Sequence, residues 1–289
     1  MTAKIIDGNA IAKRARLGLV SRVEKLAAAG VVPGLAVVLV GSNPASEVYV
    51  RRKVRACEEV GVHSEVVRFP AEARQDDVMA QLRALNEDPN IHGVIVQLPL
   101  PPQFDIRDVL EAIALEKDVD GFHLYNVGGL VLGDDRTVFP PCTPYGVQLL
   151  LEHEGIPIEG RNVVVVGASN IVGKPMAMML LRKEATVSIC HVKTRDLAQY
   201  TILADILVVA AGKPGLIRAE MVRTGAVVID VGINRLPDGR LVGDVDFEAV
   251  KEKASYITPV PGGVGPMTVT MLIWNTIEAA ERATARRTS

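Results

Sequence analysis

Short β-branched runs alternate with helical stretches through the first 115 residues of the chain. Apolar runs at 35–40, 64–69 and 93–98 predict strands, and amphipathic stretches near 44–60, 75–87 and 106–114 predict helices. Strands that alternate with helices in this way form parallel sheets covered by helices. The first part of the chain is therefore predicted to be a βαβαβ unit.

A second series of the same kind follows further along the chain. Strands are predicted at 162–167, 186–190, 206–210 and 226–230, with helices near 144–154 and 176–181. The stretch 117–143 between the two series is rich in Gly, Pro and Asp and lacks helical periodicity, which is typical of a crossing between units. The predicted fold class is α/β, with two α/β domains in tandem and the second of the Rossmann-like, dinucleotide-binding kind.

The composition of the chain argues against several classes of binding partner. The 289 residues contain 32 Lys+Arg and 34 Asp+Glu, so bulk charge favours neither nucleic acid nor an anionic membrane. The N-terminus lacks the apolar core of a signal peptide, and the apolar runs are shorter than a membrane span, so we expect a soluble, cytoplasmic protein. Cys57, Cys142 and Cys190 are widely spaced and the histidines are dispersed, which argues against disulfides and predicts no metal site.

The strand predicted at 162–167 runs into a glycine turn and then an apolar helix. Gly167 permits a tight turn, Gly173 permits close packing of helix and sheet, and free N–H groups at the helix start could hold a pyrophosphate. The motif departs from GxGxxG because Ser169 takes the place of the second glycine. A dinucleotide site and an ordinary strand–helix turn are both compatible with this segment.

The end of the next predicted strand distinguishes the two nicotinamide dinucleotides. A cofactor with a free 2′-hydroxyl usually meets Asp or Glu there, but this chain has His191, Lys193 and Arg195. A cationic pocket suits a 2′-phosphate, so NADP is favoured over NAD. The alternative is that Lys193 and Arg195 are solvated surface charges.

In the first unit, a helix near 44–60 carries a candidate catalytic pair. Asn43 is a possible N-cap and Pro44 fits the first turn. Tyr49 and Lys53 are i,i+4 neighbours, and we expect them to point away from the deepest core toward a cleft. The opposite, apolar stripe consists of Val50, Val54 and Cys57. An ordinary amphipathic helix edge would give the same pattern.

Two further polar positions favour a site over a helix edge. Gln97 follows an apolar strand at its carboxyl end, where ligands gather in open α/β sheets. Asp118 and Asp120 lie in a turn between the two units, although an ordinary Asx turn would also explain them.

The segment 256–270 is dense in Pro and Gly and runs into an apolar helical stretch. Pro261, Gly262 and Gly263 can present rigid main-chain groups to a planar heterocycle, with Gly265 helping the chain to turn. Thr268 is predicted to open a helix whose N–H groups could meet a phosphate. A tight turn between domains is the alternative.

The motifs occur in the order and spacing of a known family. They are YVRRK after VGSNPAS, GVIVQLPLP, KDVDGFH, PCTPYG, VVVVGASNIVGKP, VIDVGIN and YITPVPGGVGPMT. Together they resemble the bifunctional methylenetetrahydrofolate dehydrogenase/methenyltetrahydrofolate cyclohydrolase family over nearly the whole chain.

The resemblance implies a tetrahydrofolate one-carbon derivative bound in a cleft between the domains, and NADP on the second domain. Oxidation of the methylene compound would be followed by hydrolysis to 10-formyltetrahydrofolate. Residues 1–120 with the C-terminal helix 268–289 would form the folate-binding catalytic domain, and 121–267 the NADP-binding domain. A homodimer is also implied.

Residue roles follow from the same resemblance. Lys53 would move protons, Tyr49 would orient it, Gln97 would hydrogen-bond to it, and Asp120 would anchor the pterin, while Asp118 is expected to be structural. The predicted substrate-binding residues are Tyr49, Lys53, Val96, Gln97, Leu98, Asp120, Pro261, Gly262 and Gly263. The predicted cofactor-binding residues are Gly167, Ala168, Ser169, Ile171, Gly173, His191, Lys193, Ile233 and Thr268.

Some features leave alternatives open. Ala168 stands where some family members carry Arg, so the NADP preference depends on Lys193 and Arg195. A Cys142 nucleophile is conceivable but has no His partner in the local sequence. The alternative functions are a monofunctional dehydrogenase of the same family, a non-catalytic nucleotide-binding regulator, and a different Rossmann dehydrogenase of the shikimate type.

Overall fold

The computed structural model of the protein describes residues 2–133 and 139–288 and divides into two compact units. The six-strand unit comprises Met1–Lys13 and Thr143–Thr268, and the three-strand unit comprises Arg14–Cys142 and Val269–Ser289. Both are α/β units, as the alternating pattern predicted.

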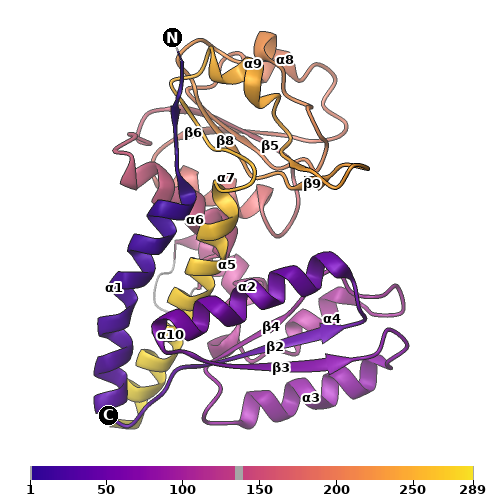
Figure 1. Cartoon of the computed structure of the whole chain (residues 1–289), viewed down its shortest axis with the longest axis vertical. Helices are drawn as coiled ribbons and strands as arrows, with labels where there is room; N and C mark the ends of the chain where they lie inside the picture. Colours follow the sequence, from indigo (N-terminus) through magenta and orange to yellow (C-terminus); the bar gives the residue numbers. More distant parts are fainter. Residues whose placement is uncertain (1, 134–138, 289) are drawn as a thin grey trace. The chain divides into compact units, whose positions relative to one another are not determined.

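The three-strand unit contains a parallel sheet with the strand order β3-β2-β4. Helices α2 and α3 cover opposite faces of this sheet (Figure 1), and every residue of β2 is buried, as a central parallel strand requires. The elements are β2 (Gly34–Val40), α2 (Pro44–Val60), β3 (His63–Phe69), α3 (Gln75–Glu87), β4 (Gly93–Val96), α4 (Ile106–Glu111), the 3-10 turn η1 (Leu115–Lys117) and α5 (Leu124–Leu132). The predicted βαβαβ series is confirmed.

In the described residues, the six-strand unit contains a parallel sheet with the order β1-β11-β8-β7-β5-β6. Its strands are β1 (Lys4–Ile5), β5 (Asn162–Val166), β6 (Thr186–Cys190), β7 (Ile206–Val209), β8 (Val227–Asp230) and β11 (Tyr256–Ile257). Its helical elements are α6 (Cys142–His153), α7 (Gly173–Arg182), α8 (Ala198–Thr201), η2 (Ala219–Met221) and α9 (Phe247–Lys251). A small antiparallel pair, β9 (Asn234–Arg235) and β10 (Leu241–Val242), lies beyond β8.

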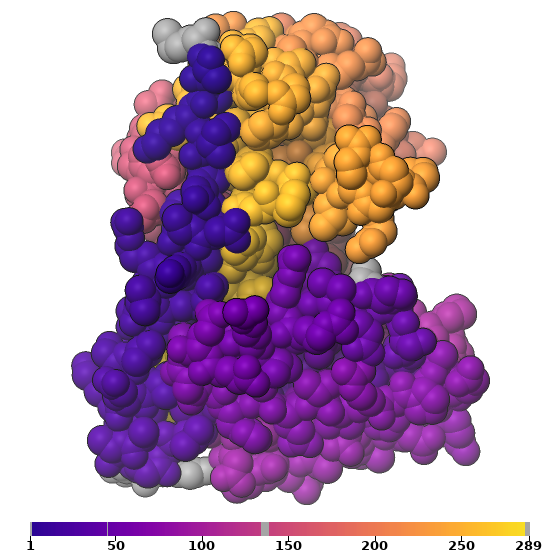
Figure 2. Space-filling view, viewed as in Figure 1, coloured from indigo at the N-terminus to yellow at the C-terminus, as the bar shows by residue number. Residues whose placement is uncertain are grey.

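The chain passes between the units inside α1 (Gly8–Ala28), at residue 142 and inside α10 (Val264–Thr288). The predicted domain boundaries therefore differ from the observed ones. Residues 1–13 belong with the six-strand unit because β1 pairs with β11, and Figure 2 shows the indigo N-terminal residues beside later, yellow-orange ones in that unit. Residues 121–142 belong with the three-strand unit, where Asn126 donates to Asp118 at 2.7 Å.

The expectation that residues 117–143 contain no helix was wrong, because α5 lies within them. The adjacent Gly128 and Gly129 weaken helix propensity by about 1 kcal/mol each, which hides the helix in the sequence. Capping offsets part of this penalty: Tyr125 N–H donates to Nδ1 of His123 at 3.1 Å, and Gly133 ends the helix with φ +77°.

Candidate functional site

Helix α2 positions the predicted catalytic pair in the three-strand unit. The Asn43 side chain accepts from Ser46 N–H at 3.3 Å, which confirms the N-cap, and Pro44 is the first helical residue. Lys53 is only 9% exposed, whereas its neighbour Val54 is half-buried. Lys53 is thus more buried than the helix pattern suggested.

Lys53 meets Gln97 from the neighbouring strand end. Lys53 Nζ donates to Gln97 Oε1 at 3.1 Å. Gln97 N–H donates to the Val38 carbonyl at 2.8 Å, which continues the β4–β2 pairing by one residue, and Gln97 Nε2 donates to the Leu98 carbonyl at 2.8 Å. The second bond turns the amide oxygen toward the lysine, so the Gln97 end of the Lys53–Gln97 contact is held by main chain.

Asp120 completes the group that we call the Lys53 cluster, which consists of Tyr49, Lys53, Gln97 and Asp120. Burial raises the pKa of Asp120, and the positive charge of Lys53 acts in the opposite direction. Burial likewise raises the pKa of the Tyr49 phenol. The cluster thus brings a half-buried acid and a buried amine within electrostatic range of each other, although they lie 67 positions apart in the sequence.

The Cys142 thiol lies beside this cluster but is not activated. Its Sγ donates to the Val119 carbonyl at 3.3 Å, and burial together with the Asp120 charge raises its pKa well above the ordinary value. A thiol held neutral in this way is a poor nucleophile, which argues against the Cys142 alternative.

The turn that carries Asp120 is fixed from two sides. Asp118, 1% exposed, accepts from the N–H groups of Phe122 at 3.2 Å and His123 at 2.8 Å and from the Asn126 amide, as its predicted structural role requires. Asn275 on α10 donates to the Val119 carbonyl at 2.8 Å. Sequence reasoning missed Asn275, which lies in an apolar helix with no motif around it.

The strand residues next to Gln97 differ in what they can offer. Val96 is buried in the core of the three-strand unit, so its predicted substrate contact is limited to its main chain. Leu98 is half-buried and follows the strand end.

In the six-strand unit, the Pro/Gly segment packs against the start of α1. Asn9 N–H donates to the Gly262 carbonyl at 3.1 Å, and Gly262 has φ +105°. A Cβ on Gly8 would lie 1.7 Å from the Gly263 carbonyl oxygen. Pro261 is exposed. The glycines are therefore required for contact with the protein's own backbone, a constraint that exists independently of any ligand.

Thr268 does not open a helix, contrary to the prediction. Helix α10 begins at Val264, and Gly265 lies within its first turn rather than in a bend. Pro266 is compatible with this because the first N–H groups of a helix need no internal partner. The Thr268 hydroxyl instead lies 3.0 Å from the hydroxyl of Thr143.

The glycine turn after β5 has the predicted geometry. Gly167 has φ +122°, and a Cβ on Gly173 would lie 1.9 Å from the Gly167 carbonyl oxygen. The Ser169 hydroxyl accepts from Val172 N–H at 3.1 Å and Gly173 N–H at 3.3 Å, and Lys174 N–H donates to the Ser169 carbonyl. These three N–H groups are thus bonded within the turn. The Ser169 O–H retains its own proton for donation.

The remaining predicted cofactor residues lie at strand ends of the same sheet. His191 closes a tight turn after β6, in which Lys193 N–H donates to its Nδ1 at 3.1 Å. No acidic side chain of the described residues pairs with Lys193 or Arg195. Ile171 and Ile233 are 37% and 44% exposed, unusual for isoleucine. Ala168 is half-buried.

Two buried acids of this unit were not singled out from the sequence: Asp230 at the end of β8 (3% exposed) and Asp244 after β10 (0% exposed). Asp230 accepts from the N–H groups of Gly232, Asp244 and Val245 at 2.9–3.0 Å. Burial raises its pKa to about 7. The available signal in the sequence was an acid that ends an apolar strand and is followed two residues later by glycine. The glycine is required there because a Cβ on Gly232 would lie 2.3 Å from the Asp244 carboxylate.

Asp244 accepts four hydrogen bonds. The donors are N–H of Ala211 at 2.6 Å, of Gly212 at 2.8 Å and of Lys213 at 2.9 Å, and Nδ2 of Asn234 at 2.8 Å. Three donors belong to the loop that follows β7, and Asn234 is the first residue of β9, directly after the loop that follows β8.

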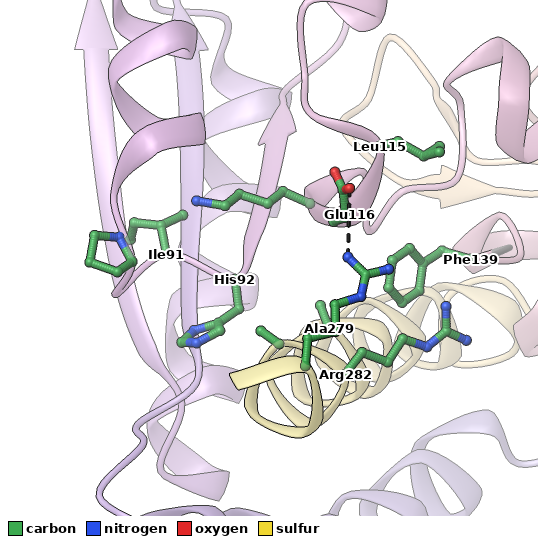
Figure 3. Close-up of a pocket in the computed structure, with 11 residues that line it drawn as sticks. Ile91, His92, Leu115, Glu116, Phe139, Ala279 and Arg282 are labelled. Atoms are coloured by element: carbon green, nitrogen blue, oxygen red, sulfur yellow. Dashed lines mark ion pairs between the residues drawn. The ribbon is translucent and has the colours of Figure 1, made fainter. Parts of the chain in front are cut away.

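A separate cavity of about 180 Å³ lies in the three-strand unit between η1 and the C-terminal part of α10 (Figure 3). Its cations are already engaged. Arg286 pairs with Glu116 at 3.6 Å, Arg282 lies over the Phe139 ring, and Lys117 donates to two main-chain carbonyls. It contains no residue of the Lys53 cluster, and nothing in it points to catalysis.

No three His, Cys, Asp or Glu side chains of the described residues are grouped so that they could hold a metal ion. None of the described helices combines the length and the apolar character needed to cross a membrane.

Two family models match the chain. The model described as "Tetrahydrofolate dehydrogenase/cyclohydrolase, catalytic domain" matches residues 6–120, and "Tetrahydrofolate dehydrogenase/cyclohydrolase, NAD(P)-binding domain" matches residues 141–284. "Bifunctional protein FolD" of Nitrosospira multiformis is 63% identical over 286 residues, 99% of each chain.

Solved structures agree with these matches. A bifunctional FolD methylenetetrahydrofolate dehydrogenase/cyclohydrolase from Campylobacter jejuni superposes with a TM-score of 0.95 at 50% identity, covering 97% of this chain and 99% of its own. The Trypanosoma brucei methylenetetrahydrofolate dehydrogenase-cyclohydrolase, complexed with NADP and an inhibitor, gives a TM-score of 0.94 at 40% identity, with 98% of each chain covered.

Proposed function

Because the chain belongs to the tetrahydrofolate dehydrogenase/cyclohydrolase family, it oxidises 5,10-methylenetetrahydrofolate with NADP⁺ and hydrolyses the methenyl product to 10-formyltetrahydrofolate, and we propose that Lys53 moves the protons of the second reaction. The observation that carries this proposal is the 3.1 Å bond from Lys53 Nζ to Gln97, within electrostatic range of the half-buried Asp120. Hydrolysis adds water to the methenyl carbon and opens the ring, which requires a proton to leave the water and another to reach a ring nitrogen. The Lys53 amine donates one hydrogen to Gln97, and its other hydrogens remain available for this transfer.

Asp120 is proposed to hold the pterin. A carboxylate accepts two parallel hydrogen bonds from an amino-pyrimidine edge more strongly than a neutral acceptor does. The burial of Asp120 disfavours its ionised form, and the Lys53 charge opposes that effect. Lys53 thus supports substrate binding as well as proton transfer. Tyr49 is proposed to cover the pterin ring, and Leu98 and the main chain of Val96, Pro261, Gly262 and Gly263 to contribute further contacts.

NADP⁺ is proposed to bind at the carboxyl ends of β5 and β6, where it would accept the hydride from the bridging carbon of the folate. The residues present fit this cofactor: Gly167 and Gly173 allow close approach, and the Ser169 hydroxyl can donate to a phosphate oxygen. Lys193, next to His191, suits the 2′-phosphate. The exposed Ile171 and Ile233 offer apolar contact, Ala168 offers close approach, and Thr268 is the remaining proposed contact.

A homodimer in the cytoplasm is also proposed. Strand β6 is an edge of the six-stranded sheet in the described residues, and the apolar Ile189 on it is 38% exposed. Val192, just after β6, is 95% exposed, and Leu203, between α8 and β7, is 60% exposed. Exposed apolar surface along a sheet edge favours association with a second copy. Sedimentation equilibrium should give twice the chain mass of 31.0 kDa, and a monomer at micromolar concentration would contradict the proposal.

The test of Lys53 is the variant Lys53→Met, which keeps the length of the side chain but removes its amine. Hydrolysis of added methenyltetrahydrofolate should fall about 10²–10⁴-fold, the usual contribution of general acid–base catalysis. The matched control is Arg55→Met on the same helix, whose side chain is exposed and pairs only weakly with Glu59 at 3.8 Å. Undiminished hydrolysis in Lys53→Met would exclude Lys53 from proton transfer.

A further inference from the structure

The loops that follow β5 and β7 lie next to each other at the point where the strand order of the sheet reverses. The chain runs from β5 to β6 on one side and then returns to β7 on the other side of β5. Ligands of open α/β sheets bind in the crevice at such a point, outside the carboxyl ends of the strands. A Cβ on Gly167 would lie 2.1 Å from the Ala210 carbonyl oxygen, so the two loops are in close contact there.

Three successive N–H groups in the loop after β7 converge on one carboxylate. Ala211, Gly212 and Lys213 donate to Asp244 at 2.6–2.9 Å. Successive N–H groups that form a concavity are a common anion-binding arrangement. Here the anion is a side chain of the protein itself, so the conformation of the loop is set before any ligand arrives.

The same carboxylate also holds the loop after β8. Asn234 Nδ2 donates to Asp244 Oδ1 at 2.8 Å, directly after the exposed Ile233. Asp244 is itself held, because its own N–H donates to Asp230 Oδ1 at 3.0 Å and the next N–H, of Val245, donates to Asp230 Oδ2 at 2.9 Å. Two strand-end loops at the crevice therefore depend on one buried acid.

We propose that Asp244 is a positioning residue for NADP⁺: by binding residues 211–213 and Asn234 it fixes the two loops that shape the crevice beside Gly167. The inference rests on the proposed location of the cofactor at this sheet. It assigns Asp244 no contact with the cofactor. Its role is to keep main-chain groups of both loops in the arrangement to which the dinucleotide binds, and so to remove the cost of ordering them on binding.

The first variant is Asp244→Asn. An amide has one acceptor oxygen, and its NH₂ would face N–H donors, so it cannot hold all four. We expect the Kd for NADP⁺, measured by isothermal titration calorimetry, and the KM for NADP⁺ to rise at least tenfold, with a smaller change in dehydrogenase kcat. Cyclohydrolase activity on added methenyltetrahydrofolate without cofactor should stay within about twofold of the wild-type value. A general loss of structure would lower both activities together and would overturn the proposal.

Two further variants control for misfolding. Asn234→Ala removes one donor at a half-buried position and leaves the acid in place, so we expect a two- to fivefold rise in the same Kd with the cyclohydrolase unchanged. Asp246→Asn removes an exposed carboxylate that accepts from Ala249 N–H at the start of α9. It should leave the NADP⁺ affinity unchanged. An unchanged Kd in both Asp244→Asn and Asn234→Ala overturns the proposal.

Lys193→Ala separates this inference from the proposed cofactor site. Lys193 is exposed, and its loss should weaken NADP⁺ binding more than NAD⁺ binding if the 2′-phosphate lies there. If Lys193→Ala weakens NADP⁺ binding and Asp244→Asn does not, only the positioning role is wrong. If neither variant affects binding, the cofactor location is wrong and the positioning role falls with it.

Discussion

The Lys53 cluster and the crevice beside Gly167 are built from different kinds of polar group. In the Lys53 cluster, the polar groups are side chains from α2, from the end of β4 and from the turn after η1. In the crevice, the polar groups are mostly main-chain N–H donors, which are held by Ser169, Asp230 and Asp244. In the proposed roles, the cluster changes protonation during the reaction, whereas the crevice keeps its shape.

The buried acids in the two regions show this difference. The positive charge of Lys53 lowers the pKa of Asp120 against the effect of burial, and Lys53 is also the proposed proton carrier. Among the described residues, Asp230 and Asp244 receive only main-chain N–H groups and the Asn234 amide, none of which titrates near neutrality. A buried carboxylate can therefore be a reactive component or a structural one, and its partners indicate which.

The most severe way to break the crevice is to substitute Gly173. In Gly173→Ala the new methyl would lie 1.9 Å from the Gly167 carbonyl oxygen, a backbone atom that cannot rotate away. We expect a loss of about 3 kcal/mol or more in the free energy of unfolding, the upper end for overpacking, measured by urea denaturation. Gly18→Ala is a suitable control, because its Cβ would meet no atom within 4 Å. Equal stabilities of the two variants would contradict the close packing of α7 on β5.

On the other side of the comparison, Asp120→Asn should weaken folate binding and spare the nucleotide. A hydrogen bond to a charged group contributes about 1.5–3 kcal/mol, so the KM for 5,10-methylenetetrahydrofolate should rise about 10- to 100-fold. The Kd for NADP⁺ is measured in parallel and should not change. A rise in both constants would mean that the variant disturbs the whole chain.

The effect that is smallest at each step of pH concerns the protonation of Asp230. Its pKa of about 7 exceeds the ordinary value of 3.8, so between these pH values the folded protein holds a proton that the unfolded chain has lost. The resulting stabilisation is present at low pH and disappears as the pH rises through about 7. The free energy of unfolding of the wild type, relative to Asp230→Asn, should therefore fall with increasing pH by at most about 1.4 kcal/mol per unit. A difference independent of pH between 4 and 7 would show that Asp230 is ionised throughout.

The alternating pattern was sufficient to predict most of the fold. Each strand of the two series was found within a few residues of its predicted position, because parallel strands buried on both faces read as continuous apolar runs. Helix α5 was missed since its stability comes from His123, Gly133 and the Asp118–Asn126 bond rather than from periodicity. The unit boundaries were misplaced because the pairing of β1 with β11 joins residues at opposite ends of the chain.

The candidate site was predictable where a residue ends a strand and less so elsewhere. The hydrogen bond between Lys53 and Gln97, which the family resemblance implied, is confirmed, and the position of Gln97 at a strand end had already marked it as a candidate. Asp244 was missed because its importance depends on a loop more than 30 residues earlier, at 211–213, whose N–H groups turn toward it only in the folded state. Ser169 was predicted to contact the cofactor, but its two bonds to N–H groups at the start of α7 could not be predicted from residue type.

Neither unit is a continuous piece of chain, which has a consequence for synthesis on the ribosome. The edge strand β1 is synthesised early but cannot pair until Tyr256 and Ile257 have been made. The Val119 carbonyl likewise cannot accept its hydrogen bond until Asn275 has been made. Both units can thus be completed only after almost all of the protein has been made, and a gene fragment cut at residue 120 would encode no finished domain. The nascent chain would spend most of its elongation with unpaired backbone groups, a period in which chaperone binding would matter most.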